Sequence, residues 1–479
     1  MGKPILMYTR VKIRLSHAAG AALGLAAVLP TQAAAHGIPV QAKDLPVPLS
    51  WFYWGAGVIL LASFVLLGGL WSKPLLARQP WKALPAWLGR IVDAAPLRWL
   101  IRGLMLACTG VVLVAATFGK TEIGDNIAPI ALFIGFWLIL LPMSVVIGDI
   151  WGWSHPAATL ARLGGVEEHR TTERQPGLWW AAAGIWAFAW LELVYPTATH
   201  VRLIGVLIAL WLLATVWQMS RVGISQCLRS YEPFAVYSRL LGRMSMFARR
   251  DGRLGVRPPV VGALDEPPVP GLALMCVLLV GTVSYDGLSR TRWWSVQVAD
   301  ATQRATDLGL SVFNARLIFG TFGMVAMSAI AYGAFEAACW AAARLGGMKA
   351  PAAGRIVGHF APTLLPIAMA YVIAHYASFV VTQGQGLLIL ASDPFGAGWN
   401  LFGTDHNRVH YNLIAPAGIW FIQVGAIAIG HVLGLVLAHE RALALTSSRR
   451  AAVMSQIAML ALMVLYTVGG LYFLSEGMT

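Results

Sequence analysis

The feature that most constrains this chain is a succession of apolar stretches, each about long enough to cross a lipid bilayer. Of its 479 residues, 58% are hydrophobic and 12% are charged, and the mean hydropathy is +0.68. A transmembrane helix needs about 20 consecutive, mainly apolar residues, because its backbone must satisfy its own hydrogen bonds in lipid. About ten stretches approach this length: 51–71, 102–118, 127–148, 178–195, 202–220, 271–285, 314–341, 360–382, 413–438 and 453–474. The sequence therefore predicts an all-α, polytopic transmembrane bundle.

Residues 1–35 have the pattern of a secretory signal peptide. A basic start precedes an apolar segment, and small residues end at Ala35, as is typical of a cleavage site. Cleavage there would make His36 the mature N-terminus and leave residues 36–479 as a single transmembrane domain. The alternative is an uncleaved anchor helix.

The distribution of basic residues predicts how the chain is threaded through the membrane. With residue 37 outside, the cytoplasmic segments contain 23 Lys and Arg and the outer segments contain 7. This asymmetry fits the positive-inside rule and predicts a bacterial inner-membrane protein with a periplasmic mature N-terminus. The longest cytoplasmic loop would be 221–270, either as an amphipathic helix on the membrane face or as a solvated loop. Long periplasmic loops would cover 286–313 and 384–412. The net charge of +14 then reflects topology, and no nucleic-acid partner is expected.

Ionisable residues in or beside the predicted spans point to a site, because such groups are costly in lipid. His375 lies about eight residues, or roughly 12 Å, below the outer end of its span. Glu192 and Asp286 lie near the outer ends of theirs. These three side chains would share a depth in the outer half of the bilayer, where they could bind a metal ion or act as a general base. The alternative is that each makes a hydrogen bond between helices.

Further histidines differ in what their positions predict. His431 would reach a deeper cavity, and a free His36 would offer an amine and an imidazole to copper or zinc. His439, roughly 12 Å further along the helix from His431, belongs to the solvated cytoplasmic edge, and His155 falls at a helix edge without an expected role. The sequence therefore predicts a divalent metal ion, zinc or copper, held by members of one set: His375, His431, His36, Asp286 and Glu192.

Several common catalytic motifs are absent from the sequence. It has no Walker A loop, GxSxG, HExxH or CxxCH, and its four cysteines are scattered without CxxC spacing. These absences argue against a P-loop ATPase, a serine hydrolase of the usual kind, a zincin and a c-type cytochrome.

Six segments carry a family resemblance: AHGIPVQAKDLPVPLSWFYWGAGVILLASF, LPMSVVIGDIWGWSHPAATL, WLELVYP, GTVSYDGLSRTRWW, AHYASFVVTQGQ and GHVLGLVLAHERAL. Together they resemble the membrane-integrated fenitrothion hydrolase family, over about residues 35–445. The resemblance implies cleavage of the P–O aryl ester bond of organophosphorus triesters such as fenitrothion, releasing a nitrophenol and a dialkyl thiophosphate. It brings no catalytic residues with it, and this sequence has no established phosphotriesterase metal motif.

The residues and the resemblance together predict a membrane-embedded hydrolase of phosphoric triesters. We expect Asp286, His375 and Glu192 to be catalytic, and a lipophilic small-molecule substrate to enter an aromatic-rich pocket from the lipid bilayer. The alternative is a metal-ion or proton-coupled transporter, or a metal-handling protein, that uses the same intramembrane residues. In a third interpretation the chain is a membrane-embedded assembly protein and these residues are structural.

Overall fold

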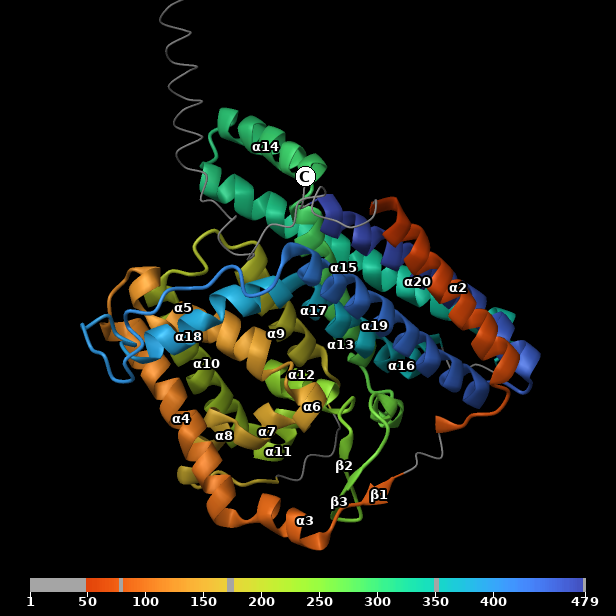
Figure 1. Cartoon of the computed structure of the whole chain (residues 1–479), viewed down its shortest axis with the longest axis horizontal. Coiled ribbons are helices and arrows are strands. Elements are labelled where there is room, and N and C mark those ends of the chain that lie inside the picture. Colours follow the sequence, from red (N-terminus) through yellow and green to blue (C-terminus); the bar gives the residue numbers. More distant parts are fainter. Residues whose placement is uncertain (1–48, 77–80, 170–175, 349–352, 477–479) are drawn as a thin grey trace, which may run out of the picture.

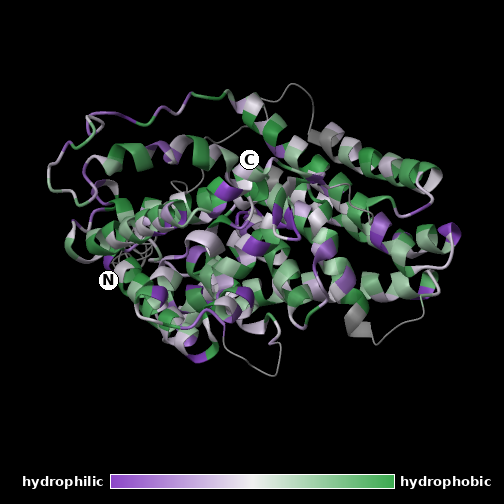
Figure 2. Cartoon of the chain, turned by 90° about the horizontal axis from the view of Figure 1, so that it is seen from below, coloured by the Kyte–Doolittle hydropathy of each residue, from purple (hydrophilic) through white to green (hydrophobic). Residues whose placement is uncertain are grey.

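The computed structural model describes residues 49–76, 81–169, 176–348 and 353–476. The predicted signal peptide and His36 lie outside the described residues. Figure 1 shows a bundle of helices with one small sheet at its edge, which confirms the all-α class. In the hydropathy view of Figure 2, hydrophobic residues run along most helices, while hydrophilic residues also occur in the middle of the bundle.

Eight helical segments of the described chain are long and apolar enough to cross a membrane. They are α4 (Ala95–Phe118), the run Ile127–Ile147, α10 (Val201–Val222), α13 (Leu272–Ser289), α15 (Val312–Leu345), the run Ile356–Ala391, α19 (Pro416–Leu445) and α20 (Arg449–Glu476). Two predicted spans are shorter: α2 (Leu49–Leu70) has an apolar segment at Trp54–Leu70, and α9 (Trp179–Leu193) has 15 residues. The chain is a multi-pass membrane protein.

Two of the spans are made of several elements. The run Ile127–Ile147 comprises α5 (Ile127–Ile130), η5 (Ala131–Leu140) and α6 (Ser144–Ile147), and the run Ile356–Ala391 includes most of α16 (Ala353–Phe360), η8 (Ala361–Leu364) and α17 (Leu365–Gln383). Shorter elements between the spans include α3 (Ala86–Asp93), η4 (Ile123–Asp125), α7 (Ile150–Ser154) and α8 (Pro156–Leu163). The η5 segment is a π-helix. Figure 1 places α4 and α10 on one side of the bundle and α2 with α20 on the other.

The close packing of α17 against α19 depends on glycine. A Cβ atom at Gly430 would lie 2.3 Å from the Cβ of Ala370, and one at Gly434 would lie 3.0 Å from the carbonyl oxygen of Thr363. Two glycines four residues apart share one helix face, so the two backbones can approach there. This contact fixes the position of α17, which carries His375.

The loop predicted at 221–270 is folded and partly buried. It contains α11 (Ile224–Gln226), η6 (Cys227–Tyr231), α12 (Pro233–Gly242), β2 (Phe247–Arg250), β3 (Arg253–Val256) and η7 (Val261–Asp265). Seven of the ten residues of α12 are buried, so this helix packs inside the bundle and does not lie on the membrane face. β3 pairs antiparallel with β2 and with β1 (Lys82–Ala83), in the order β1-β3-β2. Asp251 and Gly252 both have positive φ, as a two-residue hairpin turn requires.

The two predicted outer loops also contain helices. Residues 286–313 begin with the last turn of α13 and contain α14 (Arg292–Asp307), so Asp286 lies within a helix. Residues 384–412 contain α18 (Gln385–Ala391). Figure 1 shows α14 at the end of the bundle opposite the sheet, as expected for loops on opposite sides of a membrane.

Candidate functional site

Asp286 is the centre of a buried polar cluster between α13 and α17. Its side chain is 2% exposed, and Nε2 of His375 lies 2.7 Å from its Oδ2. The hydroxyl of Tyr376 donates to the same oxygen at 3.0 Å. Arg290, one helical turn after Asp286, donates to Oδ1 from Nη2 at 2.7 Å and from Nε at 3.1 Å. The structure therefore brings together two of the three predicted catalytic residues and adds two partners that were not predicted.

Glu192 lies beside this cluster, near the end of α9. It interacts through charge with both Asp286 and Arg290, and it makes a polar contact with the Trp137 side chain. The cluster thus contains one guanidinium group, two carboxyl groups and one imidazole. This arrangement can hold and exchange a proton, because the charge on any one member alters the charge that the others favour.

A cavity of about 220 Å³ lies next to His375, between α13, α15, α17, α19 and α20. Its wall is mainly apolar and includes Met327, Leu465 and Phe473. The polar groups in the wall include Ser284 and Tyr466, whose hydroxyl oxygens are 3.3 Å apart. Such a cavity suits a small lipophilic molecule, although it is smaller than the roughly 300–1,000 Å³ of most ligand sites.

The structure separates His431 from the Asp286 cluster. His431 is fully buried on α19, and its Nδ1 donates to the carbonyl of Ile427 at 2.8 Å. Among the described residues its Nε2 has no hydrogen-bond partner. It lines a second cavity of about 40 Å³, which shares Leu462 and Tyr466 with the cavity at His375. His431 is therefore a neighbour of the predicted site and does not contact its carboxylates.

The prediction that His439 is solvated at a helix end is wrong. This residue is 1% exposed; its Nε2 donates to the carbonyl of Trp71 at 3.0 Å, and its Nδ1 accepts from Gln456 at 2.8 Å. The next residue, Glu440, accepts from Trp71 Nε1 at 2.6 Å. These bonds join α19 to the end of α2 and to α20, so both side chains act in packing.

The predicted metal ligands do not form a ligand set in the described structure. Among the described residues, no three His, Cys, Asp or Glu side chains are grouped so that they could hold a metal ion. The guanidinium of Arg290 on Asp286 would also repel a divalent cation. We therefore derive no chemical step through zinc or copper, and metal binding stays a prediction.

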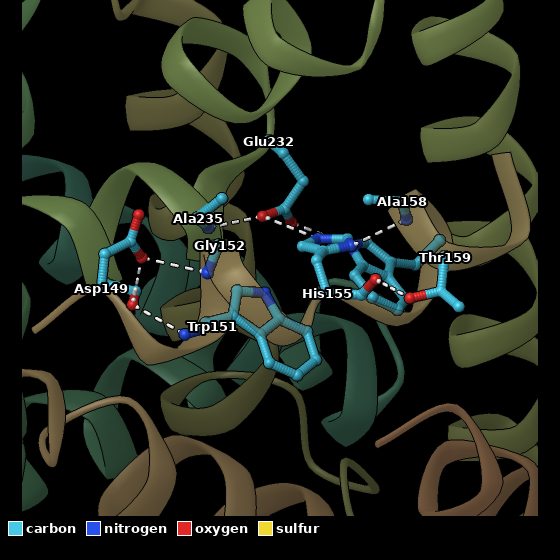
Figure 3. A network of polar contacts seen from close by, with 10 residues as sticks. Asp149, Trp151, Gly152, His155, Ala158, Thr159, Glu232 and Ala235 are labelled. Carbon is cyan, nitrogen blue, oxygen red and sulfur yellow. Dashed lines mark hydrogen bonds and ion pairs between the residues drawn. The ribbon is translucent and has the colours of Figure 1, made fainter. Parts of the chain in front are cut away.

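A second buried polar pair, which no sequence pattern predicted, joins α8 to α12 (Figure 3). Nε2 of His155 lies 3.3 Å from Oε2 of Glu232, and these side chains are 0% and 1% exposed. Both are N-caps: His155 Nδ1 accepts from Ala158 N at 3.3 Å, and Glu232 accepts from Ala235 N. In the sequence each precedes a proline, a common first residue of a helix, so both caps could have been recognised. No local sequence pattern predicts that the two side chains meet.

Asp149 belongs to the same region, as Figure 3 shows, and caps α7. Its Oδ1 accepts from Gly152 N at 3.0 Å and from the hydroxyl of Ser238 at 2.7 Å. Ser238 also lies 2.9 Å from the hydroxyl of Ser144, so the network ties three helical segments together. Burial raises the pKa of Asp149 above its usual range. The members of this network bond to one another and to helix N-termini, so the network is best explained as a structural contact between helices.

Comparisons with known proteins identify no relative of this chain. No family model, no curated protein and no solved structure matches this chain.

Proposed function

We propose that this chain is a membrane-embedded hydrolase that cleaves the P–O aryl ester bond of organophosphorus triesters such as fenitrothion. The reaction comes from the family resemblance of the sequence. The observation that carries the proposal is the 2.7 Å contact between His375 and Asp286 at the edge of an apolar cavity. A lipophilic substrate would enter this cavity from the bilayer. The threading predicted by the basic residues puts the cavity in the periplasmic half of a bacterial inner membrane.

In this proposal His375 is the general base. Nε2 of His375 lies 2.7 Å from Oδ2 of Asp286, and a proton held on Nε2 beside this carboxylate leaves the lone pair of the neutral imidazole on Nδ1. Nδ1 takes a proton from a water molecule while the water oxygen forms a bond to phosphorus. The bond between phosphorus and the aryl oxygen breaks, and the nitrophenolate leaves with its electron pair. The proton on His375 then passes to the products, which are a nitrophenol and a dialkyl thiophosphate. A nitrophenolate is a good leaving group, so the step does not need strong acid catalysis.

Other residues of the site hold the base and stabilise charge. Arg290 and Tyr376 fix the Asp286 carboxylate, which in turn orients His375. The Tyr466 hydroxyl, in the cavity wall, would donate to the phosphoryl or thiophosphoryl group as negative charge develops there. Glu192 acts through Asp286 and Arg290 and is a positioning residue.

Hydrolysis by purified protein tests the proposal. The full chain in detergent is expected to release nitrophenol from fenitrothion, measured by its absorbance. Loss of a general base lowers turnover by about 10²–10⁴-fold, so His375→Ala and Asp286→Asn should both be nearly inactive. His406→Ala, at a side chain that is 89% exposed, is the matched control and should keep wild-type turnover. Full activity of His375→Ala, or no hydrolysis by folded wild-type protein, would overturn the proposal. Loss of activity on chelation, restored by added zinc or copper, would support the predicted metal ion.

A proton-coupled transporter is the second candidate function. It is favoured by a series of polar groups between the Asp286 cluster and His431. These groups line two cavities, one beside His375 and one beside His431, which share Tyr466. The smaller cavity has room for about one water molecule, which could bond to Nε2 of His431. Proton flux into proteoliposomes, abolished in His431→Ala and without any hydrolysis, would select this function.

A further inference from the structure

Three arginines converge on a pocket at the end of the bundle where α4 begins. The pocket has a volume of about 370 Å³ and is lined by Ala95, Arg98, Trp99, Arg102, Arg162 and Glu168. Arg98 and Arg102 lie on the first two turns of α4, and Arg162 lies on the last turn of α8. Segments about 60 residues apart in the sequence therefore bring three guanidinium groups to one place.

The positive charge of this pocket is only partly neutralised. Arg162 forms a two-point ion pair with Glu168, with both N–O distances at 3.1 Å. Although burial acts in the other direction, the hydrogen bond and the charge of Arg162 lower the pKa of Glu168, so it is ionised at neutral pH. Glu168 is the one carboxylate among the described lining residues, which leaves two charges in excess. Arg102 is repelled by both Arg98 and Arg162.

Some hydrogen-bond donors in the described part of the pocket also lack an acceptor or have only a long hydrogen bond. Nη1 of Arg162 is buried and has no hydrogen-bond partner among the described residues. Nε of Arg102 makes one long hydrogen bond, 3.4 Å, to the carbonyl of Trp153. At the start of α4 the N–H groups of Ala95 and Leu97 have no side-chain cap from the N-cap residue Ala94, whereas Pro96 has no N–H. A buried donor without an acceptor is costly, and an anion in the pocket would satisfy it.

The surroundings of the pocket point to a lipid as its ligand. Trp99 is 44% exposed and Leu100 is 68% exposed on the same end of α4, and Leu104 continues this apolar face along the helix at 62%. The neighbouring α3 exposes Trp87 and Ile91. Exposed tryptophans at the end of a membrane span are typical of the headgroup level. The pocket therefore lies at the depth of a lipid phosphate, and the exposed apolar side of α4 begins beside it at Trp99.

We propose that this pocket binds an acidic phospholipid through its headgroup phosphate. The phosphate lies between Arg98, Arg102 and Arg162, and the acyl chains lie against the exposed side of α4 that begins at Trp99, a residue of the pocket wall. Arginine suits this role because its planar fork matches phosphate oxygens in a two-point bond. The choline of a zwitterionic lipid would bring a positive charge against the guanidinium groups and would be disfavoured. The lipid joins the start of α4 to the end of α8, so its binding stabilises this end of the bundle.

The test uses the purified full chain after its lipids have been exchanged for detergent. Dioctanoyl phosphatidylglycerol is expected to raise the thermal unfolding midpoint of the wild type by a few degrees, and dioctanoyl phosphatidylcholine much less. In Arg98→Gln/Arg102→Gln the affinity for phosphatidylglycerol should fall by about tenfold or more. Arg250→Gln/Arg253→Gln removes the same charge from the exposed β2–β3 hairpin and should bind as the wild type does.

Four outcomes would overturn the proposal. One is equal stabilisation by the two lipids, and another is an unchanged phosphatidylglycerol affinity in Arg98→Gln/Arg102→Gln. An equal loss of affinity in the hairpin variant would show only a general effect of charge. An equal shift with inorganic phosphate would assign the pocket to free phosphate. If the pocket variant does not fold, native mass spectrometry of the wild type decides: a retained acidic phospholipid supports the proposal, and none overturns it.

Discussion

The imidazole of His155 lies 3.3 Å from the carboxylate of Glu232, and each of these residues begins a helix. The N-termini of α8 and α12 therefore meet at one buried imidazole–carboxylate contact. A carboxylate at a helix N-terminus is stabilised by the free N–H groups and the helix dipole. The pair thus fixes the relative position of two helices on the side of the bundle opposite α2 and α20.

Removal of the Glu232 carboxylate is expected to destabilise the fold strongly. Glu232→Ala would leave the N–H groups of Ala235 and Trp211 without their acceptor and remove the carboxylate beside the His155 ring. Each buried donor left without an acceptor typically costs about 1–3 kcal/mol of the free energy of unfolding. Glu232→Gln keeps one acceptor oxygen and should cost less. The measurement is the thermal unfolding midpoint in detergent, with Glu122→Ala at an exposed position as control. A Glu232→Ala midpoint equal to that of the control would contradict the expectation.

The raised pKa of Asp149 predicts a dependence of stability on pH. Because burial raises this pKa in the folded protein, the carboxyl group keeps its proton to a higher pH than it does in the unfolded chain. Its stabilising contribution is fully present below the unfolded pKa and is lost as the pH rises through the folded pKa. Asp149→Asn cannot ionise and can still accept hydrogen bonds from Gly152 and Ser238 through its amide oxygen. Its midpoint should therefore exceed that of the wild type more in mildly alkaline buffer than in acidic buffer. A constant difference across pH would show that Asp149 does not titrate between these conditions.

The sequence predicted the membrane architecture and part of the candidate site because both depend on regular geometry. Long apolar runs identify helices whatever their partners, and the rise per residue gave Asp286 and His375 a common depth. The structure places them in contact. Arg290 follows Asp286 by four residues, or about one helical turn, and this spacing alone predicts the ion pair.

Other features depend on contacts that no local pattern encodes. His155 and Glu232 are 77 residues apart, and their meeting requires the packing of α8 and α12. The segment around α12 has an amphipathic pattern, which is the same whether the apolar face packs on lipid or on other helices. β2, with the sequence FARR, has no alternation of apolar and polar residues that would predict a strand.

The Gly430 contact predicts opposite effects for two glycine substitutions on one helix. In Gly430→Ala the new methyl group would meet Ala370 and the carbonyl of Pro366, so α17 and α19 must move apart. Such overpacking typically costs about 1–3 kcal/mol. Gly425 lies on the same helix, and a Cβ atom added there would have no atom within 4 Å, so Gly425→Ala should be neutral or stabilising. Thermal midpoints of the two variants give the comparison. A Gly430→Ala midpoint at or above that of Gly425→Ala would mean that the close approach is not needed.

Tyr376→Phe tests whether the orientation of Asp286 matters for catalysis. The Tyr376 hydroxyl donates to Oδ2 of Asp286, the same oxygen that His375 approaches. Without this donor the carboxylate loses one of the bonds that fix it, and hydrogen bonds to charged groups contribute about 1.5–3 kcal/mol. If the loss appears in the transition state, turnover of fenitrothion should fall by roughly tenfold or more, while His375→Ala should lose more. Tyr411→Phe, at a loop side chain that is 53% exposed, is the matched control. Wild-type turnover in Tyr376→Phe, together with inactivity of His375→Ala, would show that His375 works without a fixed carboxylate. Reduced turnover in both Tyr variants would instead point to a general effect on the fold.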